Sequence, residues 1–377
     1  MQGKVKLIFC TDGIFPHMVG GIQRHSLLLA TELAKSGEVD ITVIHPHAGV
    51  TVFEPSLGIH EVVVAAPKKT GRYLADCYLY SKEVLKFILQ HPDAVVYGQG
   101  FAVWAGMSKI RNRLIINPHG LEPFQGLRLS DKLLGIPFRM ILRHQFRNAA
   151  RVVSLGGRLS GIIRSNGARD SFVVLPNACN VPEPTVRKFD SSQVNFLFVG
   201  RFAYNKGIDV LALAAKELNE EGYDQRFSLS LVGKGPLYDE YVQKYSMPNI
   251  EFVGFASDEK LNELYRVKDV FVLPTLFEGM PTVVLEAMAC GMPVIVTDTG
   301  ATTEMVDEAN GFIIDKKDVN SLKSAMIQFM EMDPARRKSL SEASYNRVRE
   351  NFTWKIISDR HISLFRQIAD EMKSRND

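Results

Sequence analysis

Short apolar runs recur along this chain, and segments with apolar residues at helical spacing separate them. The runs are rich in Val, Ile, Leu and Phe, which is typical of strands covered on both faces. Strands that alternate with helices in this way predict parallel sheets with helices on each side. The runs are, in order, KVKLIFC, DITVIH, EVVVAA, DAVVYG, RLIINPHG, ARVVSL and SFVVLPN, then VNFLFVG, FSLSLVG, NIEFVGF, DVFVLP, PVIVTD and NGFIID. Helices are expected at about residues 22–36, 73–90, 102–109, 137–148, 158–166 and 334–373.

The length of 377 residues exceeds one ordinary core and suits two α/β domains. The alternation breaks at NACNVPEPTVRKFDSSQ, a polar, proline-containing span without a clear period. Such a span is typical of a linker, so we expect one domain over residues 1–183 and a second over residues 184–353. The predicted fold class is α/β, with two doubly wound, Rossmann-like domains facing each other across a cleft. Ligands of such domains bind in loops at the carboxyl ends of the strands.

The composition excludes several classes of protein. The net charge of +3 gives no overall case for nucleic-acid binding. The four cysteines are scattered without a CxxC pair, which favours reduced thiols over disulfides or a metal site. No apolar run approaches the roughly 20 residues that a membrane-spanning helix needs. The sequence therefore predicts a cytoplasmic protein, with peripheral attachment at the inner face of a membrane left open.

Two carboxylates mark the stretch PTLFEGMPTVVLEAMACGMPVIVTDTG, which follows an apolar run. A helix is expected to begin at Pro281 and Thr282, because proline suits a first helical turn. The free amides at that helix start would attract a phosphate. Glu278 precedes the helix and Glu286 lies within it, so both could accept hydrogen bonds from sugar or ribose hydroxyls. The alternative is that Glu278 is a solvated turn residue and that Glu286 only complements the helix dipole.

Cations follow the first strand of the second domain, in VGRFAYNKGID. Arg201 offers a planar fork to phosphate oxygens and Lys206 offers a point charge, so together they could neutralise a pyrophosphate. The alternative is a pair of solvated loop cations. This is not the phosphate-binding loop of P-loop enzymes, since no Ser or Thr follows Lys206.

Two loops of the first domain add weaker signals. Gly20 and Gly21 would let the backbone approach a bulky anion closely, although a pair of glycines is more often a plain flexible turn. His119 follows directly after a strand, where ligands bind, although a lone histidine is often a structural hydrogen-bonding group.

A basic stretch runs from Arg128 to Arg169, with nine Lys or Arg and a single acid. Arg139, Arg143 and Arg147 recur every four residues, so they are expected on one helix face. The simple interpretation is a solvated face. The functional alternative is a surface for anionic lipid headgroups or for a phosphorylated acceptor.

Taken together, these motifs and their order resemble the group 1 glycosyltransferases, that is, the retaining glycosyltransferase family 4 with its B-type two-domain fold. The resemblance implies that Glu286 binds ribose and that Glu278 holds hydroxyls of the donor sugar. It implies that Arg201 and Lys206 clamp the pyrophosphate, and that His119 lies near the C6 hydroxyl of the sugar. It also implies backbone contacts to the donor from Gly21, Gly279, Met280, Thr282, Val283 and Phe255, of which Phe255 lies by the base. The helix at about 354–377 is expected to pack back on the first domain.

The function that the resemblance implies is transfer of a hexose-type sugar, with retention, from a nucleoside diphosphate sugar to an acceptor hydroxyl. UDP is the favoured nucleotide, and the acceptor is expected to be a saccharide or lipid-linked saccharide of cell-envelope polysaccharide synthesis. No metal is expected, because cations and helix amides would stabilise the leaving group. The alternatives are a nucleotide-sugar epimerase or phosphorylase of related fold, and a non-catalytic nucleotide-sugar-binding protein.

Overall fold

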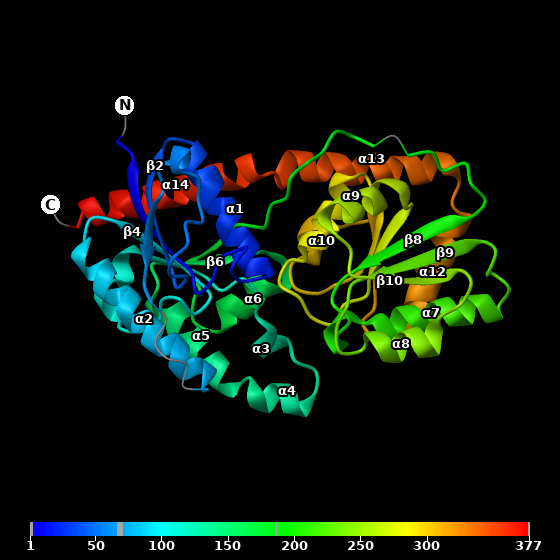
Figure 1. Cartoon of the computed structure of the whole chain (residues 1–377), viewed down its shortest axis with the longest axis horizontal. Helices are drawn as coiled ribbons and strands as arrows, with labels where there is room; N and C mark the ends of the chain where they lie inside the picture. Colours follow the sequence, from blue (N-terminus) through cyan, green and yellow to red (C-terminus); the bar gives the residue numbers. More distant parts are fainter. Residues whose placement is uncertain (1–2, 66–70, 186, 376–377) are drawn as a thin grey trace. The chain divides into compact units, whose positions relative to one another are not determined.

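The computed structural model describes residues 3–65, 71–185 and 187–375, and these form two compact units (Figure 1). Unit 1 comprises Met1–Asn177 together with Trp354–Asp377, and unit 2 comprises Ala178–Thr353. The chain therefore divides a few residues before position 183, where the sequence analysis places the boundary. The final helix belongs to unit 1.

Unit 1 is built on a seven-stranded parallel sheet with the order β3-β2-β1-β4-β5-β6-β7. Each of the seven apolar runs in the first half of the chain contributes one strand, which confirms the predicted α/β class. The strands are β1 (Val5–Cys10), β2 (Val39–His45), β3 (His60–Val63), β4 (Val95–Gln99), β5 (Leu114–Asn117), β6 (Arg151–Ser154) and β7 (Phe172–Val174). The helices are α1 (Gly21–Lys35), α2 (Tyr73–Gln90), α3 (Glu122–Gln125), α4 (Leu129–Leu134), α5 (Ile136–Asn148), α6 (Gly157–Ser165) and α14 (Trp354–Lys373), with short 3-10 turns η1 (Pro55–Leu57), η2 (Met107–Lys109) and η3 (Arg111–Arg113).

Helices cover both faces of β1, which explains its nearly continuous apolar sequence. Successive side chains of a strand point to opposite faces. Ile8 joins the apolar cluster that α2 completes. Phe9 contacts Tyr97 of β4 at 5.3 Å between ring centroids, and Tyr97 in turn contacts Phe365 of α14 at 5.5 Å. The last helix of the chain, α14, thus packs on the sheet of unit 1.

The helix expected at residues 102–109 does not form, and only the 3-10 turn η2 is present there. Gly100 and Gly106 have φ angles of 54° and 62°, in the left-handed region, which a right-handed helix cannot include. A Cβ atom on Gly106 would lie 2.5 Å from Leu85 Cδ2, so a side chain here would also have to displace that leucine of α2. The apolar residues of this segment fill the core as an irregular loop.

Unit 2 is built on a six-stranded parallel sheet with the order β10-β9-β8-β11-β12-β13. The strands are β8 (Val194–Val199), β9 (Phe227–Val232), β10 (Ile250–Gly254), β11 (Val270–Leu273), β12 (Val294–Thr297) and β13 (Gly311–Ile314). The helices are α7 (Ile208–Glu220), α8 (Tyr238–Tyr245), α9 (Asp258–Val267), α10 (Thr282–Ala289), α11 (Thr302–Met305), α12 (Val319–Glu331) and α13 (Pro334–Asn351), with the 3-10 turn η4 (Tyr204–Lys206). None of the helices in the described ranges is long and apolar enough to cross a membrane.

The span expected to be helical from residue 334 to residue 373 consists of two helices, α13 and α14, and α14 begins at Trp354, where the last helix is expected to begin. Between them, Thr353 forms a parallel β-bridge with Cys179, and the Cys179 amide donates to the Phe352 carbonyl at 2.9 Å. These strand-like hydrogen bonds require extended backbone, so the helix cannot continue through this point.

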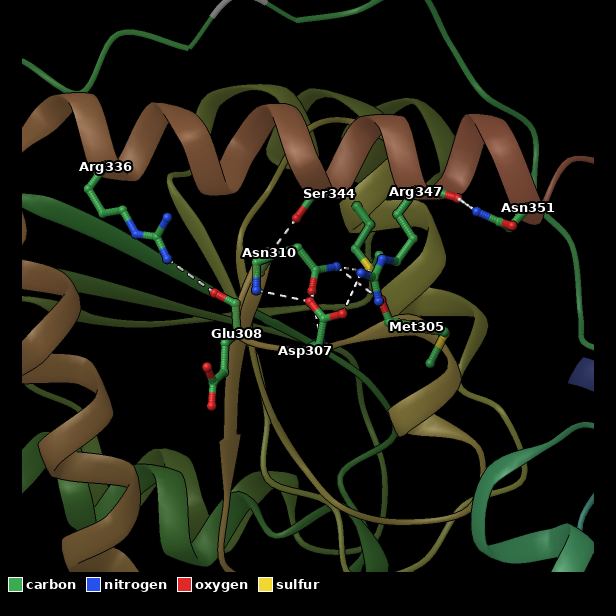
Figure 2. Close-up of polar contacts among 10 residues, drawn as sticks. Met305, Asp307, Glu308, Asn310, Arg336, Ser344, Arg347 and Asn351 are labelled. Carbon is green, nitrogen blue, oxygen red and sulfur yellow. Dashed lines mark hydrogen bonds and ion pairs between the residues drawn. The ribbon is translucent and has the colours of Figure 1, made fainter.

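Polar contacts hold α13 on unit 2 (Figure 2). Arg347 Nη2 lies 2.5 Å from Asp307 Oδ2, and Ser344 Oγ donates to the Asn310 carbonyl at 3.2 Å. Asn310 Nδ2 donates to the Met305 carbonyl at 3.0 Å, so the same turn is also closed internally. Side-chain donors thereby provide hydrogen-bond partners for backbone carbonyl groups of the turn that leads into β13.

Arg187 fastens the segment that enters unit 2. Its guanidinium donates to the carbonyls of Tyr265 and Lys268, at the end of α9, and to the carbonyl of Cys290, which caps α10. A cation at the carboxyl ends of two helices also complements both helix dipoles. Burial lowers the pKa of Arg187 to about 10, so the guanidinium remains charged at neutral pH.

We predict that Arg187→Ala lowers the stability of unit 2 by about 2–4 kcal/mol, because it removes charged donors from three carbonyl groups. Arg187→Lys should recover only part of this loss, since one ammonium cannot replace the planar fork. Hydrogen exchange read by mass spectrometry should show faster exchange in α9 and α10. Both tryptophans, Trp104 and Trp354, lie in unit 1, so tryptophan fluorescence supplies the internal control. Equal exchange in α9 and α10 of wild type and Arg187→Ala would contradict the assignment.

Candidate functional site

The strand order of unit 2 places β8 and β11 at the point where the chain changes direction across the sheet. From β8 the chain moves to β9 and β10 on one side, and from β11 it moves to β12 and β13 on the other. The loops that follow β8 and β11 therefore diverge at the carboxyl ends of these strands, which is where open α/β sheets bind ligands. One loop contains Arg201 and Lys206, and the other contains Glu278.

These two loops are joined by close backbone contacts. A Cβ atom on Gly207 would lie 2.0 Å from the Pro274 carbonyl oxygen, so only glycine fits at this position. The Asn205 carbonyl accepts from the Thr275 hydroxyl at 2.7 Å and from the Leu276 amide at 2.7 Å. The turn that carries Lys206 is therefore fixed against the loop that carries Glu278.

Lys206 and Glu278 form an ion pair between their Nζ and Oε1 atoms, and both side chains are largely buried. The Thr275 hydroxyl donates to the same Glu278 oxygen at 3.1 Å. Arg201, in contrast, is exposed, and its guanidinium has no hydrogen-bond or ion-pair partner among the described residues. The site thus holds a paired cation and an unpaired one within six positions of the chain.

A third loop supports Glu278 and Gly279 from behind. Gly300 has a φ of 53°, and a Cβ atom there would lie 2.1 Å from the Gly279 carbonyl oxygen. The Ala301 amide donates to that carbonyl at 2.8 Å. The backbone orientation at Gly279 and the buried Met280 is therefore set by a loop distant in sequence.

Helix α10 begins at Thr282, directly after Pro281, as the sequence predicts. Thr282 and Val283 are partly exposed, and their amides lie in the first turn, where no intrahelical acceptor exists. Glu286 lies one turn further along, and Tyr265 of α9 donates to its Oε2 at 3.1 Å. The helix start, with its partial positive charge, and a carboxylate held by a tyrosine thus share one short element.

Phe255 lies apart from this group. It follows β10, two strands away from β8, and its side chain is 81% exposed. The structure thus brings Arg201, Lys206, Glu278, Gly279, Met280, Thr282, Val283 and Glu286 onto adjoining loops of unit 2. Gly21 and His119 belong to unit 1.

In unit 1, Gly21 is the first residue of α1, and a Cβ atom there would meet nothing within 4 Å. The start of α1 therefore has open space beside it. His25, one turn further along α1, lies edge-on to His119 with 4.8 Å between ring centroids. The two unit 1 residues that the sequence singles out are thus connected through α1.

A buried hydrogen-bond chain fixes His119, whose φ of 58° is unusual for a residue with a side chain. The His119 amide donates to Asn117 Oδ1 at 3.0 Å, and Asn117 Nδ2 donates to Tyr97 Oη at 3.0 Å. Tyr97 Oη lies 3.1 Å from His361 Nε2 on α14. The His119 ring contacts Gln99 through Nε2. Burial, with a smaller effect of His361, lowers the pKa of His119 to about 3, so the imidazole is neutral at physiological pH.

Asp12 is a site residue that the sequence analysis missed. It follows β1 at the switch point of the first sheet, where β1 lies between β2 and β4. Burial raises the pKa of its carboxyl group to about 6. Its carboxylate has no side-chain partner among the described residues, and Oδ2 lies 3.9 Å from the position a Cβ atom on Gly100 would take. The available signal was an acid directly after a buried strand, which is where ligand-binding side chains concentrate.

Elsewhere in unit 1, His17, His45, His47 and Glu61 lie close together. Within the described ranges, no group of three or more His, Cys, Asp or Glu could hold a metal ion. The four cysteines are free thiols, and three of them are buried.

Two family models match adjoining parts of the chain. One, described as glycosyl transferases group 1, matches residues 183–347, and the other, described as glycosyltransferase family 4, matches residues 19–181. An uncharacterized glycosyltransferase of Methanocaldococcus jannaschii is 27% identical over 304 residues, covering 78% of this chain and 81% of the relative. O-antigen chain mannosyltransferase B of Escherichia coli is 24% identical over 400 residues, covering 96% of this chain and 100% of the relative.

Solved structures share the fold. Sucrose-phosphate synthase from Thermosynechococcus elongatus matches with a TM-score of 0.78 at 19% identity, covering 97% of this chain and 99% of that one. HepE of Anabaena, solved in complex with UDP-glucose, matches with a TM-score of 0.67 at 17% identity, covering 98% of this chain and 99% of that one. With the family matches spanning both units, these findings show that the chain belongs to the group 1 glycosyltransferases, a family of polysaccharide and glycan biosynthesis.

Proposed function

We propose that this protein transfers a hexose-type sugar, with retention of configuration, from a nucleoside diphosphate sugar to an acceptor hydroxyl. The observation that carries the proposal is the Lys206–Glu278 pair, held beside the start of α10 at the switch point of the second sheet. Lys206 with the free helix amides, Glu278 and Glu286 match three parts of such a donor, which are the diphosphate, the sugar and the ribose. The UDP-glucose complex of HepE supports UDP as the first nucleotide to test.

In the proposed reaction, the bond between the sugar C1 and the diphosphate oxygen breaks, and a bond from C1 to the acceptor oxygen forms on the same face. The acceptor proton passes to the departing phosphate. Arg201, Lys206 and the amides of Thr282 and Val283 stabilise the negative charge that develops on the diphosphate. Glu286 accepts from the ribose hydroxyls, and Tyr265 fixes the carboxylate that does so. That no metal takes part stays a prediction.

Lys206 has two roles in this proposal. Without donor it neutralises Glu278, so neither charge is left unpaired in a largely buried position. A bound diphosphate would compete for the lysine, and the released Glu278 carboxylate would then accept hydrogen bonds from the sugar hydroxyls. The pair thus links diphosphate binding to sugar recognition.

Asp12 is the group we assign to the acceptor hydroxyl. Its pKa of about 6 leaves it ionised at neutral pH, and a carboxylate without a side-chain partner is a strong hydrogen-bond acceptor. A saccharide or lipid-linked saccharide offers such hydroxyls. The cytoplasmic location and the membrane contact expected from the sequence also stay predictions. The residues proposed below for the membrane contact differ from the arginine row that the sequence suggests.

A non-catalytic nucleotide-sugar-binding protein is the second candidate. Such a protein would need the donor site but would gain nothing from Asp12. The buried charge of Asp12 makes the native state less stable at neutral pH. An epimerase would convert the sugar without an acceptor. Product analysis separates these alternatives from a transferase.

The proposal predicts that nucleoside diphosphate sugars raise the melting temperature. A thermal-shift screen with UDP-, GDP- and ADP-sugars should show one nucleotide that stabilises strongly, since a ligand at 100 times its dissociation constant adds about 2.7 kcal/mol. With the selected donor, slow release of free nucleoside diphosphate and of the unchanged sugar should follow. Stabilisation without any release, with or without saccharide acceptors, would favour the binding protein.

Glu286→Ala provides the control for that screen. The wild type should prefer UDP to 2′,3′-dideoxy-UDP, or the corresponding pair for another base, because only the ribose hydroxyls contact Glu286. In Glu286→Ala the preference should disappear. A preference of equal size in both proteins would exclude Glu286 as the ribose ligand.

Substitutions of Lys206 and of Glu278 should change the affinity for nucleoside diphosphate in opposite directions. Calorimetry measures this affinity. Lys206→Ala should weaken binding and lower turnover by about 100-fold or more. Glu278→Gln should tighten binding by about 3- to 10-fold, because it removes a negative charge and releases Lys206, while sugar transfer falls. Lys244→Ala, on the exposed face of α8, is the matched lysine control and should change neither. Tighter binding in Lys206→Ala, or weaker binding in Glu278→Gln, would be inconsistent with competition for the lysine.

Asp12→Asn should make the protein more stable at neutral pH. The pKa of the Asp12 carboxyl group rises from 3.8 to about 6 on folding. The contribution of this group to the free energy of unfolding therefore decreases as the pH increases through that interval, and the decrease is complete above pH 6. The gain in Asp12→Asn should therefore be near zero at pH 4 and on the order of 2 kcal/mol at pH 7.5. Melting curves at the two pH values measure it, and sugar transfer should decrease in the same variant. A pH-independent difference would show that burial of the charge is not the cause.

A further inference from the structure

Apolar side chains are unusually exposed in one short part of unit 1. Six of the sixteen large apolar residues that are exposed in the described ranges lie between positions 127 and 140. We refer to residues 127–140 as the α4–α5 elbow. Leu129 is 73% exposed, Leu134 is 74% exposed and Met140 is 64% exposed. The other three are Leu127, Leu133 and Ile136.

The elbow is held firmly, so this exposure is not the result of a loose segment. Helix α4 packs on α3 and α5 at the periphery of unit 1 (Figure 1). Gly135 alone connects α4 to α5, and a Cβ atom there would lie 3.0 Å from the Pro123 carbonyl oxygen. Arg139 donates to that same carbonyl at 2.8 Å and to the Lys132 carbonyl at 2.7 Å. The leucines therefore project from a backbone that hydrogen bonds keep in place.

These contacts change the role of the arginine row that the sequence analysis singles out. Arg139 caps backbone carbonyls, and Arg143 Nε donates to Asn166 Oδ1 at 2.8 Å while its guanidinium lies over the Phe124 ring. Two of the three arginines thus hold unit 1 together and are only partly exposed. Within residues 122–148 the exposed cations are Arg147, near the end of α5, and Arg128 and Lys132, which lie among the leucines of α4.

The charge around the elbow is clearly positive. Residues 122–148 contain five Lys or Arg and two acids, a net +3, which equals the formal net charge of the whole chain. Lys132 has no acidic partner among the described residues. One of the two acids, Asp131, accepts from the Arg128 amide at 3.1 Å and so serves as a helix cap.

We propose that the α4–α5 elbow docks on the surface of a bilayer that contains anionic phospholipid. The leucines of α4, with Ile136 and Met140, would enter the boundary between headgroups and acyl chains, while Arg128 and Lys132 contact lipid phosphates. Apolar side chains with interspersed cations are the combination that interfacial helices use. A second copy of this chain fits less well, because a two-fold contact would place each positive surface against its own copy.

The test is co-sedimentation of the full chain with vesicles of phosphatidylcholine, with and without one third phosphatidylglycerol. Wild type should bind the anionic vesicles, and added salt should weaken binding. The partition coefficient of the double variant Leu133→Ser/Leu134→Ser onto the vesicles should be lower than that of wild type by about tenfold or more. Lys132→Glu should bind less and should lose part of the salt dependence. Leu89→Ser, which changes an exposed leucine at the end of α2, is the matched control and should bind as wild type does.

Circular dichroism melting should show that all variants remain folded, so that lost binding reports the surface. Equal binding by wild type and the double leucine variant would overturn the proposal. So would equal binding to neutral and anionic vesicles, or a dimer in solution that the leucine substitutions dissociate. The readout uses no nucleotide sugar, so its outcome does not depend on the proposed transferase reaction.

Discussion

The close approach of Gly207 to the Pro274 carbonyl is the constraint on which the candidate site depends. It holds the loop after β8 against the loop after β11, and no side chain could occupy that space. Lys206 and Glu278, 72 positions apart in sequence, are consequently side by side. Gly300 does the same for the next loop, against Gly279. Glycines thus provide backbone contacts, and the charged residues depend on these contacts for their positions.

Most of the architecture follows from local sequence, because strands covered on both faces must be nearly continuously apolar. This is why β1 and β8 could be predicted, and why Pro281 could be recognised as preceding a helix start. The predicted helix at 102–109 is wrong because its apolar residues fill the core from a loop, and the left-handed φ of Gly106 follows from that loop. The interruption between α13 and α14 depends on Cys179, which is far away in sequence.

The candidate site shows the same division. Arg201, Lys206, Glu278 and Glu286 could be proposed because charged residues at strand ends and helix starts are conspicuous in a sequence. Asp12 carried the same signal, an acid directly after a buried strand, but the burial that raises its pKa is a property of the folded chain. For the arginine row on α5, the structure adds what the sequence pattern cannot show, and whether the row contacts a membrane stays a prediction. A helical period shows which residues share a face, but it does not show that Arg139 and Arg143 already have partners.

The cationic side chains of this protein therefore fall into groups according to the hydrogen-bond acceptors that they contact. Arg187, Arg139 and Arg143 donate to backbone carbonyls or an amide oxygen, so they contribute to folding whether or not a ligand is present. Lys206 has a carboxylate partner, which a more highly charged diphosphate can replace. Arg201 and Lys132 have no partner within the described ranges, and an exposed cation gains most from an external anion. The difference in acceptors, rather than the difference in net charge, separates structural cations from those available to bind a donor or a membrane.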